Sequence, residues 1–311
     1  MNQSRKGRSR LVAAAKRVKK GDNMYAITGI TGKVGGAAAE ALLEAGLPVR
    51  AVLRDAEKAK RWSARGCEIA LAELTDPEGL AAAFAGTAAV FAMKPSIFDP
   101  SPGFTEAERY TKAMHTALLK STPAKVVALS TIGAVSDRPN LLSQFRPMEA
   151  AMSTLPIPVT FLRAAWFMEN AALDVAAARE TGVIQSYLQP VDRKIPMIAT
   201  DDVGRTAAEL MQEQWSGVRV VELEAMERVS PNEIARAFAK ALGRNVTVRA
   251  VPRTSWEEIF RAEGMKNPRP RMQMVDGFNE GWIDFSDKGS GARKGRIGID
   301  AAIAALTAKE R

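Results

Sequence analysis

Three glycines with a fixed spacing follow the first apolar run of the chain and open its first helical stretch. The run at 24–28 leads directly into Gly29, Gly32 and Gly35, which have the spacing G-x-x-G-x-x-G. The first glycine permits a tight turn, the second removes a Cβ that would hold a ligand away from the backbone, and the third lets the helix pack closely on the strand. The amino end of such a helix offers unpaired N–H groups to phosphate oxygens. This arrangement predicts a site for the pyrophosphate of a dinucleotide.

Apolar runs and helical stretches alternate from residue 24 to residue 163. They predict strands at 24–28, 47–54, 67–74, 88–93, 125–130 and 157–163, and helices at 33–46, 55–66, 76–86 and 105–121. This alternation is typical of βαβ units, whose right-handed crossovers give a parallel sheet with helices on both faces. We therefore expect an α/β fold with a Rossmann-type, doubly wound parallel sheet, and ligands at the carboxyl ends of its strands.

The pattern loosens after residue 163 and predicts a smaller, mostly helical C-terminal lobe. We expect helices at 167–179, 201–214, 230–242, 254–262 and 270–282, and short strands at 218–223 and 245–251. The expected organisation is a basic leader at 1–23, an NAD(P)-binding domain at 24–163 and a substrate-binding lobe at 164–311. The strand near 218–223 is a candidate to return to the main sheet.

The positive charge of the chain is concentrated in its first residues. The formal net charge is +9, and residues 1–23 hold eight basic residues and one acidic residue. The remainder has 36 basic and 34 acidic residues, so its composition argues against a nucleic-acid-binding face on the folded body. The first segment suits a disordered leader or an upstream start ahead of Met24, an organelle-targeting segment, or an arm for nucleic acid or anionic lipid. We expect a cytoplasmic protein, with targeting through 1–23 as the alternative.

Cysteine and histidine are too few for several kinds of site. The chain has one cysteine, Cys67, and one histidine, His115. This excludes an internal disulfide framework and any multi-cysteine or histidine-rich metal site, so we expect no metal. No apolar run approaches the roughly 20 residues that span a bilayer. The oligomeric state stays open between monomer and homodimer.

The end of the second predicted strand bears on the choice of cofactor. Arg54 stands there, nineteen residues beyond Gly35. An acidic residue at this place accepts hydrogen bonds from the 2′-OH of NAD, whereas an arginine can clamp the 2′-phosphate of NADP. Asp55 follows directly and keeps NAD(H) as the alternative, while Lys33 and Lys58 are further candidates for phosphate. We expect NADP(H) to be preferred.

Six segments together make the chain resemble the NmrA-like family, an atypical branch of the short-chain dehydrogenases/reductases. They are TGITGKVGG at 28–36, VRAVLRD at 49–55, ELTDPEGL at 73–80, VVALSTIGA at 126–134, PVTFLRAAWFMEN at 158–170 and DDVGRTAAELM at 201–211. Many relatives share the first, and its combination with FLRAAWFMEN is much more specific. The resemblance covers about 24–300. It implies an NAD(P)-binding fold in a family that includes quinone and triphenylmethane-dye reductases and cofactor-sensing regulators.

The resemblance also implies roles for residues that follow the first four strands. The pyrophosphate would lie against Gly29, Thr31, Gly32, Lys33, Val34 and Gly35. The 2′-phosphate would face Arg54, and adenine would lie beside Glu73 and Leu74, although relatives usually have Asp at the first of these. The ribose and nicotinamide would lie beside Met93, Lys94 and Pro95.

The proton donor of conventional relatives is missing. They reduce carbonyls with a Tyr-x-x-x-Lys pair, but none of the three tyrosines here is followed four positions later by lysine. Alignment with the family puts the motif at Phe145 and Glu149, which offer neither a phenol nor a positive charge. A quinone or a cationic dye accepts a hydride without a concerted proton from a side chain. We therefore expect an NAD(P)H-dependent reductase of a quinone or similar planar electrophile, with a non-catalytic NAD(P) sensor that acts through a partner as the alternative.

Candidate substrate residues follow the sixth predicted strand. Trp166, Phe167 and Met168 offer aromatic rings and a soft thioether, which suit a small planar apolar substrate and equally suit packing between lobes. Phe145, Asn170 and Met197 complete the expected pocket.

Catalytic residues are not assigned, and three side chains are weak candidates. Ser130 and Thr131 end the fifth predicted strand, where a hydroxyl can orient a substrate oxygen or cap a turn. Glu149 lies on an expected helix, where it would hold the ribose or be a solvated charge.

Overall fold

The computed structural model describes residues 24–308, so the predicted leader at 1–23 lies outside the described residues. Eight parallel strands form one sheet in the order β12-β10-β6-β5-β4-β1-β2-β3. Their bounds are β1 Tyr25–Thr28, β2 Val49–Leu53, β3 Glu68–Leu71, β4 Ala89–Ala92, β5 Val126–Thr131, β6 Val159–Ala164, β10 Val218–Ala225 and β12 Arg293–Gly295. The expected Rossmann-type α/β fold is confirmed.

The strand order reverses between β1 and β4. β1 pairs with β2 on one side and with β4 on the other, so the chain builds the sheet outward in both directions from this point. Both strands are buried at every position, which explains their uninterrupted apolar sequences. In doubly wound folds, ligands bind at the carboxyl ends of the strands beside such a reversal.

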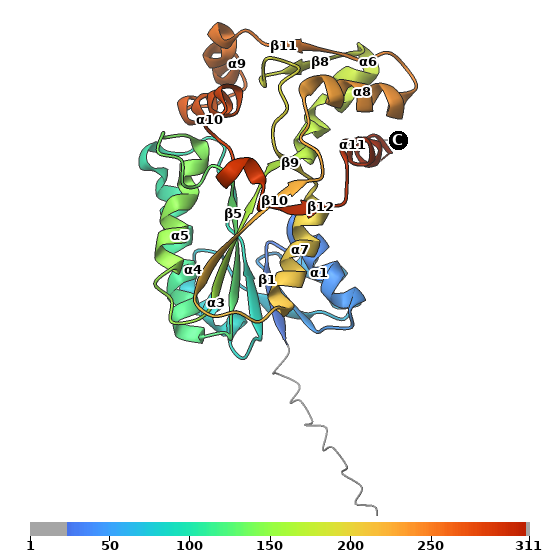
Figure 1. Ribbon diagram of the computed structural model, residues 1–311. Coiled ribbons are helices and arrows are strands. Elements are labelled where there is room, and N and C mark those ends of the chain that lie inside the picture. Colours follow the sequence, from blue (N-terminus) through green and yellow to red (C-terminus); the bar gives the residue numbers. More distant parts are fainter. Residues whose placement is uncertain (1–23, 309–311) are drawn as a thin grey trace, which may run out of the picture.

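Helices cover both faces of the sheet (Figure 1). One face carries α1 Lys33–Glu44, α2 Ala56–Ala64 and α7 Thr200–Gln212, and the other carries α3 Pro77–Phe84, α4 Thr105–Ser121 and α5 Arg146–Met152. In α1, the buried side chains of Val34, Ala38 and Leu42 recur every four residues, the spacing that places them on one side of a helix.

Small residues let α7 lie directly on α1. A Cβ on Gly204 of α7 would stand 2.5 Å from Cβ of Ala37 and 2.6 Å from the carbonyl oxygen of Val34. This close packing fixes the position of α1, the helix that follows the glycine loop.

The C-terminal lobe lies over the carboxyl edge of the sheet (Figure 1). It contains two small parallel sheets, in which β7 Trp166–Phe167 pairs with β9 Met197–Ile198, and β8 Val183–Ser186 pairs with β11 Thr247–Ala250. Its helices are α6 Val175–Glu180, α8 Pro231–Leu242, α9 Trp256–Ala262, α10 Arg269–Glu280 and α11 Ile299–Ala308. One apolar core continues from the α1 face of the sheet into this lobe.

Most expected elements are present, and one expectation is wrong. The helix expected at 167–179 is interrupted: its first residue belongs to β7, a 3-10 helix runs over Met168–Asp174, and only α6 is α-helical. The reason is tertiary, because Trp166 and Phe167 pair with Met197 and Ile198 of β9, a strand further along the chain. The strand expected at 218–223 does join the main sheet, as β10 beside β6.

Elements from both sides of residue 163 build the main sheet. β10 and β12 extend it, and α7 covers one of its faces. The division into domains at 24–163 and 164–311 stays a proposal. Within residues 24–308, no helix is both long and apolar enough to cross a membrane.

Candidate functional site

The glycine loop has the geometry that its spacing predicts. Gly29 has a φ of +63°, a conformation that other residues rarely adopt, and it turns the chain out of β1. A Cβ on Gly35 would stand 2.3 Å from the carbonyl oxygen of Gly29, so only glycine allows α1 to approach the turn this closely. Because these positions carry no Cβ, a ligand can approach the backbone of the loop that follows β1.

The amino end of α1 is open to an anion. Gly32 occupies the N-cap position and provides no side-chain cap, and the first turn holds no acidic residue. Thr31, Gly32 and Lys33 are exposed, whereas the side chain of Val34 is buried beneath them. Uncapped N–H groups and the positive end of the helix dipole favour a phosphate at this place.

The end of β2 offers a free cation beside this loop. Arg54 is exposed and makes no hydrogen bond or ion pair with any residue in the described part of the chain. The neighbouring Asp55 is already engaged, because its carboxylate caps α2 by accepting hydrogen bonds from the N–H groups of Glu57 at 2.9 Å and Lys58 at 3.4 Å. Asp55, which leaves NAD(H) as the alternative cofactor, thus has a structural role as the cap of α2.

The two residues expected beside adenine follow β3. Glu73 is exposed, and Leu74 is half-buried against the core on the α3 face. They lie on the loop between β3 and α3, and their part in binding stays a prediction.

A buried threonine ties the loops after β1 and β4 together. The hydroxyl of Thr28 donates to the carbonyl oxygen of Phe91 at 3.1 Å and accepts from the N–H of Met93 at 2.7 Å. The terminal methyl of Met93 lies 2.8 Å from where a Cβ on Gly29 would stand. The residues predicted for pyrophosphate and for nicotinamide are therefore brought together at the reversal of strand order.

Lys94 follows Met93 and is held in an unusual environment. Its amine donates to Oε1 of Gln144 at 3.1 Å and lies 3.6 Å from the centre of the Phe145 ring. Burial lowers the pKa of Lys94 to about 7, because the charged form loses hydration. Pro95, the next residue, is exposed.

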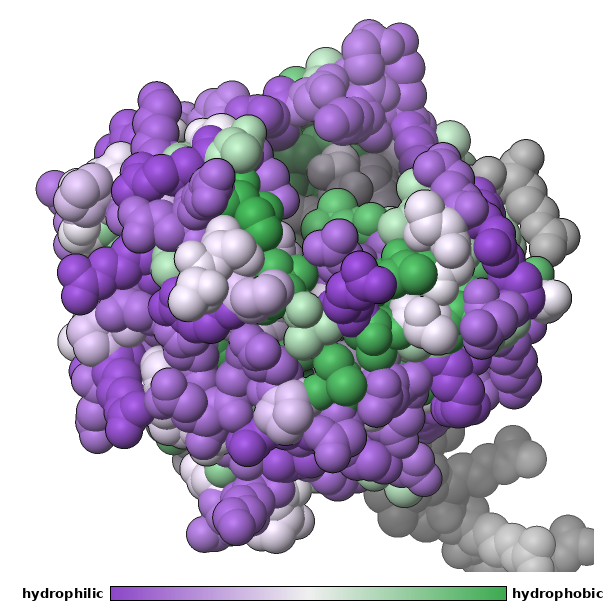
Figure 2. Space-filling model, turned by 90° about the horizontal axis from the view of Figure 1, so that it is seen from above, coloured by the Kyte–Doolittle hydropathy of each residue, from purple (hydrophilic) through white to green (hydrophobic). Residues whose placement is uncertain are grey.

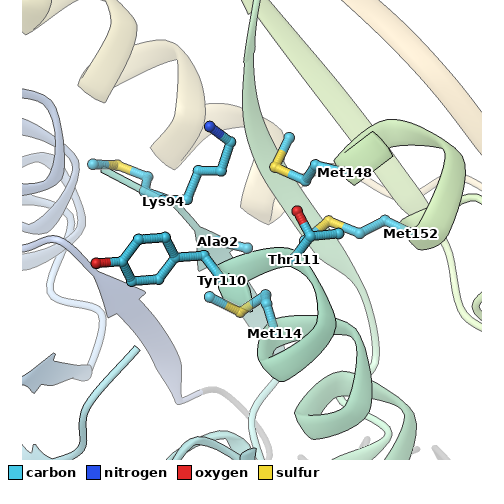
Figure 3. Close-up of a pocket in the computed structure, with 8 residues that line it drawn as sticks. Ala92, Lys94, Tyr110, Thr111, Met114, Met148 and Met152 are labelled. Carbon is cyan, nitrogen blue, oxygen red and sulfur yellow. The ribbon is translucent and has the colours of Figure 1, made fainter. Parts of the chain in front are cut away.

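A small cavity lies beneath Lys94, between the end of β4, α4 and α5 (Figure 3). It measures about 10 Å³, room for about one water molecule, and four methionines line much of it. The hydroxyl of Thr111 in its wall is buried and has no hydrogen-bond partner within the described residues. In Figure 3 the Lys94 side chain extends away from Tyr110 and Met114.

Ser130 and Glu149 belong to a buried ionic cluster. The Ser130 hydroxyl donates to Oε1 of Glu149 at 2.5 Å, and Arg163 donates to both carboxylate oxygens, at 3.0 and 2.6 Å. Ser130 and Glu149 are 3% and 7% exposed. Glu149 is therefore a buried carboxylate whose charge is balanced by Arg163, and not a solvated helix charge. Thr131 is half-buried, and its carbonyl oxygen accepts from the N–H of Ala134 at 3.1 Å.

A wider cleft of about 360 Å³ opens after β5. One wall is the loop at 132–138, and the other is the segment at 282–286, which includes Trp282 and Phe285. The face of the molecule seen from above in Figure 2 is mostly hydrophilic and also shows several hydrophobic residues. Concave, partly apolar sites of this size are typical of small-molecule binding.

The residues expected to line the substrate pocket do not share one environment. Trp166 and Phe167 are half-buried, and the Trp166 ring packs edge-on against Phe278 at 5.2 Å. Three others lie in the interior, namely Phe145, Met168 and Met197, which are 6%, 2% and 1% exposed. Asn170 is exposed. Their contact with a substrate stays a prediction.

Sequence reasoning missed two parts of this region. Arg163 carried a usable signal, because a charge inside an otherwise apolar strand needs a partner. The segment at 282–286 carried no signal in the sequence, because its place opposite the loop after β5 follows from the packing of the C-terminal lobe. Within residues 24–308, no three Asp, Glu, His or Cys side chains gather to hold a metal ion.

Comparison with known proteins agrees with this architecture. The model of the NmrA-like family matches residues 22–281. The chain belongs to the NmrA-like family. Because the match includes the glycine loop, β4 and the Ser130 cluster, the family covers every part of the candidate site except the 282–286 segment.

Three relatives within this comparison have described activities. An NAD(P)H azoreductase from Xenophilus azovorans is 27% identical over 264 residues, which cover 83% of this chain and 85% of that protein. An NADPH-dependent quinone oxidoreductase from Escherichia coli, solved with NADPH, is 21% identical, with a TM-score of 0.76, covering 91% of this chain and 99% of that one. The Citrobacter sp. triphenylmethane reductase, solved with NADP(H), is 20% identical, with a TM-score of 0.75 and the same coverage. These two structures share the fold of this chain.

Proposed function

We propose that this protein is an NADPH-dependent oxidoreductase that transfers a hydride to a quinone or a similar planar electrophile. The observation that carries the proposal is the amino end of α1, where glycines leave the backbone open and no side chain caps the first turn. A pyrophosphate suits this place because the first residues of α1 are exposed, uncapped and free of acidic side chains. The names of the relatives, an azoreductase, a quinone oxidoreductase and a triphenylmethane reductase, support the same class of reaction.

The preference for NADPH over NADH rests on the end of β2. Arg54 has no hydrogen-bond or ion-pair partner within the described residues, and the carboxylate of Asp55 caps α2. A free guanidinium suits a 2′-phosphate, whereas a carboxylate used in capping is poorly placed to accept from a 2′-OH.

The proposed kind of acceptor follows from the missing tyrosine phenol and from the partly apolar cleft. The family position of the tyrosine is held by Phe145, and that of the lysine by Glu149, whose charge Arg163 neutralises. Without a phenol, an alcohol dehydrogenase would lose roughly 10²–10⁴ in rate. Acceptors that take up a hydride readily, such as quinones, azo compounds and cationic dyes, depend less on that proton, and the partly apolar cleft suits their flat rings.

The test is the loss of NADPH absorbance when purified full-length protein meets a panel of quinones, azo dyes and triphenylmethane dyes. We expect turnover with at least one of these acceptors, faster with NADPH than with NADH. Tight NADPH binding without turnover of any acceptor would contradict the proposal and favour a cofactor-sensing role.

A further inference from the structure

The ammonium of Lys94 lies over Phe145, the family position at which the phenol of conventional relatives is missing. We propose that Lys94 donates the proton that a quinone or azo acceptor requires after it has taken up a hydride, so that a residue just after β4 replaces the phenol missing at Phe145. This inference rests on the proposed function and assigns a residue to it.

The position of Lys94 supports this role in two ways. Through Met93, which covers Gly29, it lies at the reversal of strand order, where the reacting part of a bound ligand is expected. Its amine also lies 3.6 Å from the ring centre of Phe145, the residue at the family position of the missing tyrosine. The Lys94 amine therefore lies in the same part of the site as the phenol would in a conventional relative.

The 3-10 helix that holds Lys94 contacts the loop that forms one wall of the cleft after β5. Gln144 and Phe145 belong to the 3-10 helix Leu141–Phe145. The same helix packs on the cleft wall, because a Cβ on Gly133 would stand 2.8 Å from Cδ1 of Leu142. The helix therefore connects the residues that contact the Lys94 amine, Gln144 and Phe145, with the wall of the cleft.

No described carboxylate competes for the proton of Lys94. Among the titratable side chains of α4 and α5, only Tyr110 lines the cavity beneath Lys94, and the charged residues of α5 are Arg146 and Glu149. Glu149 is engaged by Arg163, and Arg146 donates to two carbonyl oxygens of the loop after β5. Burial alone accounts for the lowered pKa of Lys94, which leaves an ammonium able to release and regain a proton near neutral pH.

The step balances without any further reactant. The bound cofactor supplies a hydride, and a quinone that has accepted it carries a negative charge on oxygen. An N–H bond of the Lys94 ammonium then breaks and an O–H bond forms on the reduced quinone. The neutral amine takes a proton from water. Until the transfer, the positive charge of Lys94 stabilises the oxyanion, as preorganised donors do in other enzymes.

Acceptors differ in their need for this proton, and the difference provides the test. A cationic triphenylmethane dye becomes neutral when it gains a hydride and needs no proton. A quinone or an azo compound needs one. A proton donor therefore affects quinone and azo reduction but not dye reduction, whereas a residue that only holds the cofactor affects all three.

The experiment compares three variants of the full chain with the wild type. Lys94→Met removes the ammonium at similar length, and Lys94→Arg keeps the charge but does not release a proton near neutral pH. Lys112→Met is the control, since Lys112 is exposed on α4 and lies outside the site. Each is assayed for kcat and KM with a quinone and with a cationic triphenylmethane dye across neutral pH.

We expect Lys94→Met to lower kcat for the quinone by about 10²-fold more than it lowers kcat for the dye, with both rates of Lys112→Met unchanged. The wild-type quinone rate should fall as pH rises through about 7, and Lys94→Arg should abolish that dependence. An equal loss with both acceptors, or no loss with the quinone, would overturn the inference. Absence of turnover in the wild type would instead overturn the proposed function.

A second readout does not depend on activity. In protein with ¹³C-labelled lysine side chains, one resonance that is absent from Lys94→Met should titrate near neutral pH, well below the ordinary lysine pKa of about 10.4. A Lys94 resonance that titrates near the ordinary lysine pKa of about 10.4 would also overturn the inference, because that ammonium would not release its proton near neutral pH.

Discussion

Adding one methyl group to the glycine loop should separate the cofactor site from the rest of the fold. In Gly35→Ala, the new Cβ would stand 2.3 Å from the carbonyl oxygen of Gly29, 2.7 Å from its carbon and 2.9 Å from the nitrogen of Ile30. These are backbone atoms, so the loop or α1 must move by about 1 Å to restore ordinary contact. We expect a loss of stability of about 1–3 kcal/mol.

The neighbouring glycine is a matched control. A Cβ on Gly36 would meet nothing nearer than the carbonyl oxygen of Ile30 at 3.4 Å, which is ordinary contact. Because Gly36 lies within α1, Gly36→Ala should stabilise the protein by up to about 1 kcal/mol.

Calorimetric titration with NADPH and denaturant unfolding measure both effects. Displaced N–H groups lose charge-assisted hydrogen bonds, each worth about 1.5–3 kcal/mol, so Gly35→Ala should bind NADPH at least about tenfold more weakly. Gly36→Ala should bind it as the wild type does. Equal NADPH affinity in the two variants would refute the claim that the pyrophosphate lies against this loop.

Three further predictions address other parts of the structure. Arg54→Ala should weaken binding of NADPH at least about tenfold more than binding of NADH in calorimetric titrations, and an equal loss for both would remove Arg54 from the 2′-phosphate site. Arg163→Met leaves the buried carboxylate of Glu149 without its partner and should cost about 3 kcal/mol in denaturant unfolding; a cost below about 1 kcal/mol would mean that the pair contributes little. Burial raises the pKa of Asp174 from 3.8 to about 6, so the folded protein binds this proton more tightly than the unfolded chain does and loses stability as pH rises from about 4 to about 6. Asp174→Asn should therefore stabilise the protein by about 2 kcal/mol at pH 7 and by almost nothing below about pH 4, and a gain that does not change with pH would contradict this cause.

The sequence was most informative where structure is local. The glycine spacing, the six apolar runs up to residue 163 and the Asp76–Pro77 start of α3 each determine a turn, a strand or a cap from neighbouring residues alone. The prediction of the sheet followed from their alternation, because parallel strands need crossover helices. The return of a strand near 218–223 to the sheet was also foreseen, from its apolar pattern.

Contacts between distant segments could not be predicted from local sequence patterns. The failure at 167–179 has such a cause: an alanine-rich stretch favours helix, but Trp166 and Phe167 pair with Met197 and Ile198 instead. The partners of Glu149 and of Lys94 likewise come from other elements, so their charges and hydrogen bonds had no signature in local spacing. Only the packed structure shows that one carboxylate is neutralised and that one amine is held over an aromatic ring.

Hydride transfer itself is tested most directly by following the transferred atom. The purified protein is given a cationic triphenylmethane dye and NADPH that carries deuterium at the transferred position of C4, and the reduced dye is analysed by mass spectrometry. A deuterium on the central carbon of the dye is the predicted result, because the dye gains that hydrogen from the cofactor and does not exchange it with water. Reduced dye without deuterium, after transfer from either face of the nicotinamide has been tested, would contradict the account.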